Sequence, residues 1–126
     1  MLAKEEFIDF INLLAGYKIR FKEIHWLNTS KAIHEATDNL GWNIERISDS
    51  FAEEFLSIYD RSALQPNDYN ATILLSDEFE ITLQSLTDDV NAFRSKLTDP
   101  VYNGLNSNLD NFISEINITT YRGGLN

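Results

Sequence analysis

The sequence has 126 residues, a formal net charge of -10, 43% hydrophobic residues and no cysteine. This hydrophobic fraction fits one globular domain over residues 1–126 and is not that of a disordered chain. The acidic balance is not that of a general nucleic-acid binder, which neutralises phosphates with clustered Lys and Arg, so DNA binding is not expected. Because cysteine is absent, disulfides and thiolate metal sites are excluded, and any metal ligands must be His, Asp or Glu.

The first residues predict neither a signal peptide nor a membrane anchor. The opening MLAKEEFIDF carries acidic residues where a signal peptide has its positive segment, and no apolar run approaches membrane-spanning length. We therefore expect a cytoplasmic protein that has no membrane partner.

Apolar residues recur at three- and four-residue steps through most of the chain, which predicts amphipathic helices. The first helix is expected over about 4–26 and the second over about 31–59. The short link at 28–30 joins them, and either Thr29 or Ser30 can cap the second helix.

Two further helices are predicted after a long polar connection at about 60–71. The third is expected over about 76–97, and Asp99 and Pro100 then supply a cap and a first-turn proline for a fourth, which runs to about Thr119. The sequence thus predicts an all-α chain: a four-helix bundle with a long connection between its second and third helices.

The second predicted helix carries a polar arc that its apolar stripe does not explain. At about 100° per residue, five side chains that can bind metal lie away from the stripe. They are His34, Asp38, Glu45, Asp49 and Glu53. His34 and Asp38 form one i,i+4 pair, and Asp49 and Glu53 form another, so the members of each pair can share an ion. The two pairs lie roughly 16 Å apart along the helix, whereas metal–ligand bonds are about 2 Å, so one chain cannot close a site with both pairs.

A second copy of the chain can complete the site. If two such helices lie antiparallel about a two-fold axis through their middle, His34 faces Glu53 of the other chain while Asp38 faces Asp49 of the other chain. One symmetric contact then yields two equivalent sites, and such isologous contacts are the commonest way to dimerise. The spacing therefore predicts an intersubunit metal site.

The other histidine of the chain, His25, ends the first predicted helix, and a short link lets it reach His34. Imidazole and carboxylate ligands with open positions suit ferrous iron, with Zn²⁺ and Mn²⁺ as competitors. Two roles stay open: Glu45 is an alternative accessory ligand, and Trp26 is either interface packing or part of the site.

These residues resemble the signature of the Dps (mini-ferritin) family, within the ferritin-like superfamily. The motif is His25-Trp26 followed by His34-x3-Asp38-x10-Asp49-x3-Glu53. The segment Asp49-Ser50-Phe51-Ala52-Glu53 is similar to the family's D-x-x-A-E element. The resemblance covers residues 21–56.

The resemblance implies a ferritin-like four-helix bundle that assembles through a two-fold dimer into a hollow dodecamer. It also implies iron storage and protection from oxidative damage, through Fe(II) oxidation by peroxide or dioxygen at an intersubunit ferroxidase site. His25, His34 and Asp38 match ligands of one subunit, and Asp49 and Glu53 match those of the other. These five are the expected catalytic and metal-binding residues.

The chain also departs from the family pattern. The gap between His25 and His34 is shorter, Glu54 replaces an arginine, and the lysine-rich arm through which some members bind DNA is missing. An alternative function is that of a structural or assembly protein whose shared metal site is structural only. A carboxylate-bridged oxygenase within one bundle is disfavoured, because no E-x-x-H pair occurs.

Overall fold

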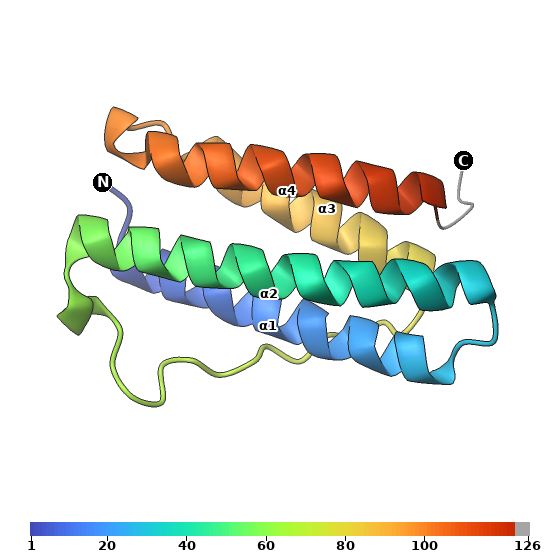
Figure 1. The fold of residues 1–126 in the computed structure, drawn as a ribbon. Coiled ribbons are helices and arrows are strands. Elements are labelled where there is room, and N and C mark those ends of the chain that lie inside the picture. The colour runs from blue at the N-terminus through green and yellow to red at the C-terminus, as the bar shows by residue number, and fades with distance from the viewer. Residues whose placement is uncertain (123–126) are drawn as a thin grey trace.

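The protein is all-helical over residues 1–122, which the computed structural model describes and Figure 1 shows. The helices are α1 (Lys4–Leu27), α2 (Lys31–Tyr59), α3 (Phe79–Lys96) and α4 (Asn103–Arg122), with short 3-10 helices η1 (Arg61–Ala63) and η2 (Pro100–Tyr102). The prediction of an all-α chain with four helices is confirmed. Within the described residues, none of the helices is long and apolar enough to cross a membrane.

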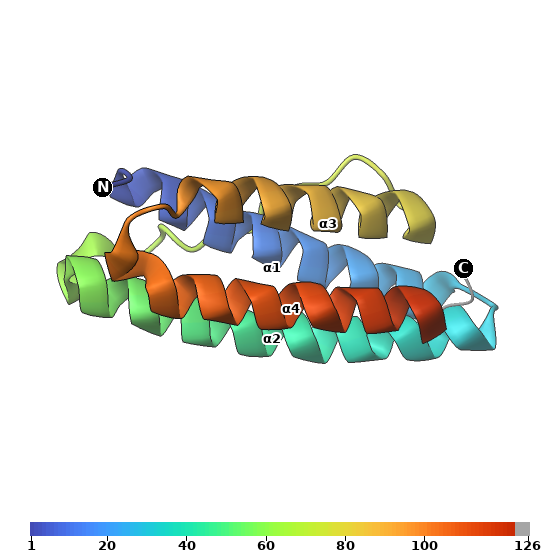
Figure 2. The ribbon, with the colours of Figure 1, turned by 90° about the horizontal axis from the view of Figure 1, so that it is seen from above.

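The four helices form a bundle in which each helix packs mainly on two neighbours. α1 packs on α2 and α3, while α4 packs on the other sides of α2 and α3, an arrangement visible from above in Figure 2. Phe21 packs on Phe79 near one end and Phe10 on Phe93 near the other, so α1 and α3 run antiparallel. α2 runs parallel to α3 (Figure 1).

Aromatic side chains fill the half of the bundle where α1 begins. The ring centroids of Phe7 and Phe55 are 5.0 Å apart, and those of Phe10 and Phe93 are 4.3 Å apart. Phe51 meets Phe93 edge-on at 5.8 Å. All five rings are buried, and burying each stabilises the fold by roughly 1.5–3 kcal/mol. These contacts fix α1, α2 and α3 relative to one another.

The link between α1 and α2 is held by its own polar side chains. The Ser30 hydroxyl oxygen accepts a hydrogen bond from the Ile33 amide at 3.4 Å, so Ser30, rather than Thr29, caps α2. Asn28 accepts from the Ser30 amide through Oδ1 at 2.8 Å. The backbone amide of Asn28 donates to the Ile24 carbonyl at 2.9 Å, and this is the hydrogen bond at the end of α1. This tight link places the end of α1 beside the start of α2.

α2 ends at Tyr59 because the next residue leaves helical geometry: Asp60 has φ 144° and ψ 154°. Residues 60–78 then return along α1. The Thr72 amide donates to the Asn12 carbonyl at 3.0 Å, and Arg20 donates through Nη2 to the Leu74 carbonyl at 2.8 Å.

α3 begins at Phe79, three residues after the expected start at Ser76. The Ser76 hydroxyl oxygen accepts from the Glu78 amide at 3.2 Å, and Glu78 is extended. The side chain thus satisfies an amide that would otherwise enter the first helical turn, and the chain turns before the helix starts.

The start of the last helix follows the expected cap. Asp99 accepts from the Val101 amide through Oδ1 at 3.0 Å, and Pro100 opens the short helix η2 that leads into α4. α4 runs through Arg122, past the expected end at Thr119.

Candidate metal centre

The polar arc predicted for α2 lies on an unbroken helix from Lys31 to Tyr59, so its sequence spacing is also its spatial spacing. All five members of the arc are exposed, namely His34, Asp38, Glu45, Asp49 and Glu53. On the opposite side of α2, Leu40, Ile44 and Phe51 are fully buried. The arc is therefore an outer surface, flanked by α1 on one side and α4 on the other.

The two histidines, predicted to converge, are stacked. The ring centroids of His25 and His34 are 3.7 Å apart and their planes differ by 22°. Nδ1 of His25 lies 2.7 Å from the carbonyl oxygen of His34, and Nδ1 of His34 lies 2.9 Å from the carbonyl oxygen of His25. Each ring is thus held by the backbone of the other residue, and the short link brings them together without strain on either helix.

A cavity of about 230 Å³ opens between α1 and α2 next to this pair. Its lining includes His25, Asp38 and Glu45, together with two lysines of α1. Lys18 Nζ lies 3.3 Å from Glu45 Oε1. The carboxylate proposed as an accessory ligand is therefore paired with a lysine in the single chain.

Asp49 and Glu53 lie outside this cavity, further along α2. Within residues 1–122 of a single chain, no group of three or more His, Asp or Glu side chains is arranged to hold a metal ion. The chain brings His25 and His34 together, with Asp38 one helical turn beyond His34, and leaves Asp49 and Glu53 further along α2. This separation of the ligands is expected if two chains share the site. That two chains share it stays a prediction.

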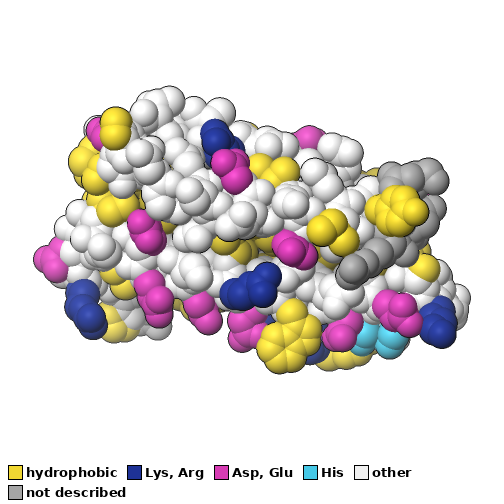
Figure 3. Space-filling model, turned by 45° about the horizontal axis from the view of Figure 1, so that its top comes forward, with side chains coloured by type: hydrophobic (Ala, Val, Ile, Leu, Met, Phe, Trp, Pro, Cys, Tyr) yellow, Lys and Arg dark blue, Asp and Glu magenta, His cyan; other side chains and the backbone are white. Residues whose placement is uncertain are grey.

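Two large apolar side chains near the arc face solvent. Trp42 is 70% exposed and Trp26 is 67% exposed. Next to Trp26, a groove of about 390 Å³ runs between α1 and the connection, and its lining includes Ile19 and Tyr69. Figure 3 shows the histidines in cyan at one edge of the molecule, beside acidic and hydrophobic side chains. Exposed apolar surface of this kind marks interaction sites.

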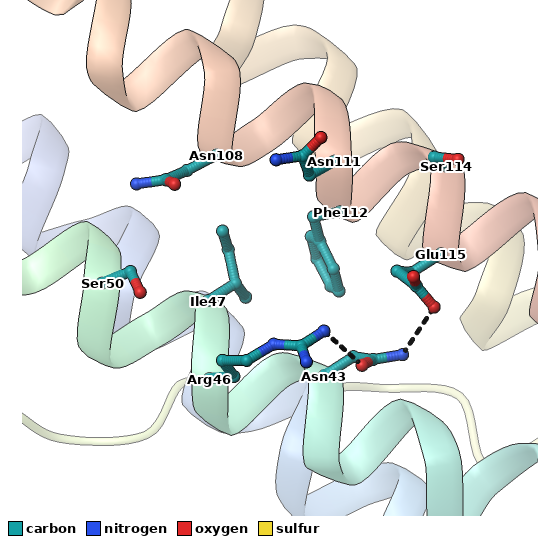
Figure 4. Close-up of a pocket in the computed structure, with 9 residues that line it drawn as sticks. All are labelled: Asn43, Arg46, Ile47, Ser50, Asn108, Asn111, Phe112, Ser114 and Glu115. Carbon is teal, nitrogen blue, oxygen red and sulfur yellow. Dashed lines mark hydrogen bonds between the residues drawn. The ribbon is translucent and has the colours of Figure 1, made fainter.

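The other flank of α2 carries a wider cavity of about 440 Å³, shared with α4 (Figure 4). Arg46 donates through Nη2 to Asn43 Oδ1 at 2.9 Å, and Asn43 donates through Nδ2 to Glu115 Oε2 at 3.4 Å. Ile47 and Phe112 also line it. Its described lining has one carboxylate and no histidine, so it does not share the chemistry of the arc.

Sequence reasoning missed two groups around the histidines. Thr37 is 2% exposed, and its hydroxyl oxygen lies 3.3 Å from Nδ1 of His25. Lys18 meets Glu45 across the α1–α2 contact. The register of the helical hairpin, which the short link fixes, is the signal that could have found both.

Comparisons with protein-family models, with curated proteins and with solved structures each find no match.

Proposed function

We propose that the chain binds ferrous iron as a substrate and oxidises it at a site shared by two copies, as a mini-ferritin of the Dps type. The observation that carries the proposal is the stacked pair of His25 and His34 beside Asp38, on an exposed helix face that continues to Asp49 and Glu53. Imidazole nitrogens and carboxylate oxygens together match the donor preference of ferrous iron, with zinc and manganese as competitors.

The second half of the site comes from a second chain. Because α2 is continuous, an antiparallel copy that places His34 opposite Glu53 of the other chain also places Asp38 opposite Asp49 of the other chain. The exposed Trp42 lies near the middle of this contact and supplies apolar surface for burial. The dimer therefore contains two equivalent sites, each built from both chains.

The residues at the site support oxidation as well as binding. Carboxylates favour the more highly charged ferric product over the ferrous substrate. With hydrogen peroxide as oxidant, two ferrous ions each lose one electron, the O–O bond breaks, and two protons are taken up to give two waters. Dioxygen is the alternative oxidant.

The course of the chain supports a ferritin-like bundle. Of the four-helix topologies, the ferritin-like one has a single long crossover, and residues 60–78 fill that place between the antiparallel pairs α1–α2 and α3–α4. We propose that dimers assemble further into a hollow dodecamer that stores the ferric product. With a net charge of -10, the assembly is not expected to bind DNA.

The shared site is tested by complementation between two inactive variants. Asp38→Ala and Glu53→Ala should each bind and oxidise ferrous iron poorly, because each removes a ligand from both sites of its dimer. In a mixed dimer, the Asp38→Ala substitution of one chain and the Glu53→Ala substitution of the other affect the same site. The second site keeps all its ligands. Mixed dimers should therefore regain about half of the wild-type rate, followed as ferric absorbance after peroxide is added to anaerobic ferrous protein.

Glu80→Ala, which removes an exposed carboxylate on α3, is the matched control and should keep the wild-type rate. If the mixture stays inactive while mass measurement shows that mixed dimers form, the two-chain site is wrong. If the wild type binds iron but does not oxidise it, the site is structural and the protein is an assembly component.

A further inference from the structure

The contacts between the two histidines determine where their protons lie. Nδ1 of His25 is 2.7 Å from the His34 carbonyl oxygen, and Nδ1 of His34 is 2.9 Å from the His25 carbonyl oxygen. A carbonyl oxygen only accepts hydrogen bonds, so each Nδ1 must carry the hydrogen. In a neutral imidazole the other nitrogen, Nε2, then has a free lone pair.

We propose that this interlocked histidine pair is a tautomer lock, which holds both rings as the Nδ1–H form and leaves both Nε2 lone pairs free to ligate divalent metal ions, with Thr37 as a positioning residue for His25. The inference rests on the proposed function for the identity of the iron substrate. The lock itself is a property of the metal-free single chain, because both acceptors are backbone atoms of the same hairpin.

Thr37 reinforces one side of the lock. Its hydroxyl donates to the Ile33 carbonyl at 2.8 Å, and its oxygen also lies 3.1 Å from the His34 carbonyl oxygen. The same oxygen lies 3.3 Å from Nδ1 of His25. The His25 N–H is therefore shared between the His34 carbonyl and the Thr37 hydroxyl. Thr37 is buried on α2 and its hydroxyl contacts the His25 ring, which belongs to α1, so Thr37 holds this ring against α2.

A hydrogen bond donated by the nitrogen that does not bind the metal does more than orient a ligating histidine. An imidazole whose other nitrogen donates a hydrogen bond has a fixed tautomer and a more basic ligand nitrogen. Two such nitrogens favour borderline ions such as zinc and ferrous iron over hard ions such as magnesium, which prefer oxygen. The pair thus supplies the selectivity for transition metals, and the carboxylates of the arc supply the charge.

The tautomers can be read directly by nitrogen NMR of the metal-free protein. Long-range proton–nitrogen correlation at about pH 8.5, where imidazole rings are neutral, should show Nδ1 protonated and Nε2 unprotonated in both rings. His25→Ala and His34→Ala assign the signals. A ring that carries its proton on Nε2, or that exchanges between both forms, would overturn the proposal.

Thr37→Val and Thr37→Ser separate positioning from packing. The valine variant keeps the shape of the side chain but loses the hydroxyl, so the His25 ring should populate the second tautomer. The affinity for Zn(II) should fall about 10-fold, as it does when a ligating histidine loses the hydrogen-bond partner of its other nitrogen. The serine variant retains the hydroxyl and should restore both. If valine and serine behave alike, Thr37 has only a packing role and the positioning claim is wrong.

Zn(II) is the probe for the ligating atom because it is diamagnetic. On titration the Nε2 signals of both rings should shift while both Nδ1–H signals persist, and Mg(II) at the same concentration should leave them unchanged. Binding through Nδ1, or an equal response to Mg(II), would contradict the proposal. These spectra need no oxidation, so a protein that fails to oxidise iron but shows the lock refutes the proposed function alone.

Discussion

Tyr17 carries a buried polar group into the contact between α1 and α3. The side chain is 1% exposed, and its hydroxyl is hydrogen-bonded to the Asp89 carboxylate and, at 2.7 Å, to the Ser85 hydroxyl. Burial, and then the hydrogen bond to Asp89, raise the pKa of Tyr17 well above its ordinary value. The neutral phenol is therefore favoured by the fold.

This raised pKa predicts a loss of stability at high pH. The unfolded chain ionises its tyrosines near pH 10, while the folded chain holds Tyr17 neutral to a higher pH. Its contribution is thus fully present below about pH 10 and falls as pH rises above it. Tyr17→Phe should lose less free energy of unfolding than the wild type between about pH 9 and pH 11, measured by urea denaturation.

At pH 7 the same variant should be less stable by roughly 1–3 kcal/mol, because Asp89 loses its buried partner. An alkaline loss as steep as that of the wild type would show that Tyr17 does not contribute to it.

The sequence predicts the meeting of the histidines but not this contact. A short link leaves few ways to place His25 relative to His34, so their pairing follows from spacing alone. Tyr17 fits the apolar stripe of α1 equally well, and its partner Asp89 lies on a helix reached only after a long connection. Which carboxylate meets a buried hydroxyl depends on packing between distant segments, and no local pattern encodes that.

At the scale of elements, the connection formed by residues 60–78 can lie close against α1 because residue 16 is a glycine. A Cβ at this position would overlap the Thr72 carbonyl oxygen, and Thr72 is held there by the hydrogen bond that its backbone amide donates to the Asn12 carbonyl. The glycine thus lets the connection lie directly on α1, at the cost of helix propensity.

Gly16→Ala should lift the connection from α1 and destabilise the metal-free protein by roughly 1–3 kcal/mol through overpacking, less about 1 kcal/mol gained in helix propensity. Amide exchange at Thr72 should become faster. Gly41→Ala is the matched control, because nothing lies within 4 Å of a Cβ there. It should be neutral or stabilising by up to about 1 kcal/mol. Equal stabilities of the two variants would contradict close docking of the connection.

Element boundaries show the same division between local and distant causes. The bounds of α2 follow from its stripe and from the Ser30 cap, and both are local. α3 starts three residues after the expected Ser76, because the contact of Leu74 with Arg20 holds the preceding chain against α1 and the Ser76 hydroxyl then takes up the Glu78 amide. The Ser76 contact is local, but the contact with α1 is not, and the segment's own residues do not reveal it.

At the scale of the whole molecule, the proposed dimer concentrates negative charge around its axis. Each chain brings Asp38, Asp49 and Glu53 to the contact, whereas Glu45 is offset by Lys18 within its own chain. No ion pair among the described residues involves Asp49 or Glu53. Like charges at short range repel, and salt screens them weakly once the surface is partly buried. We therefore expect a metal-free dimer to be strained and a bound cation to relieve the strain.

The charge balance can be changed without changing shape by the double substitution Asp49→Asn/Glu53→Gln. In the wild type, Zn(II) or Fe(II) at about 100 times the Kd should add about 2.7 kcal/mol to the free energy of unfolding, roughly a 10 °C rise in Tm. The double variant should show a much smaller rise, because its amides replace two anionic ligands.

Without metal, that variant should melt at a temperature at least as high as the wild type, since it loses repulsion and keeps its packing. Thermal unfolding followed by circular dichroism, at matched protein concentration with and without metal, measures both effects. A double variant that is markedly less stable without metal would mean that Asp49 and Glu53 form stabilising pairs in the assembly. The shared metal site would then lose the half that the second chain is proposed to supply.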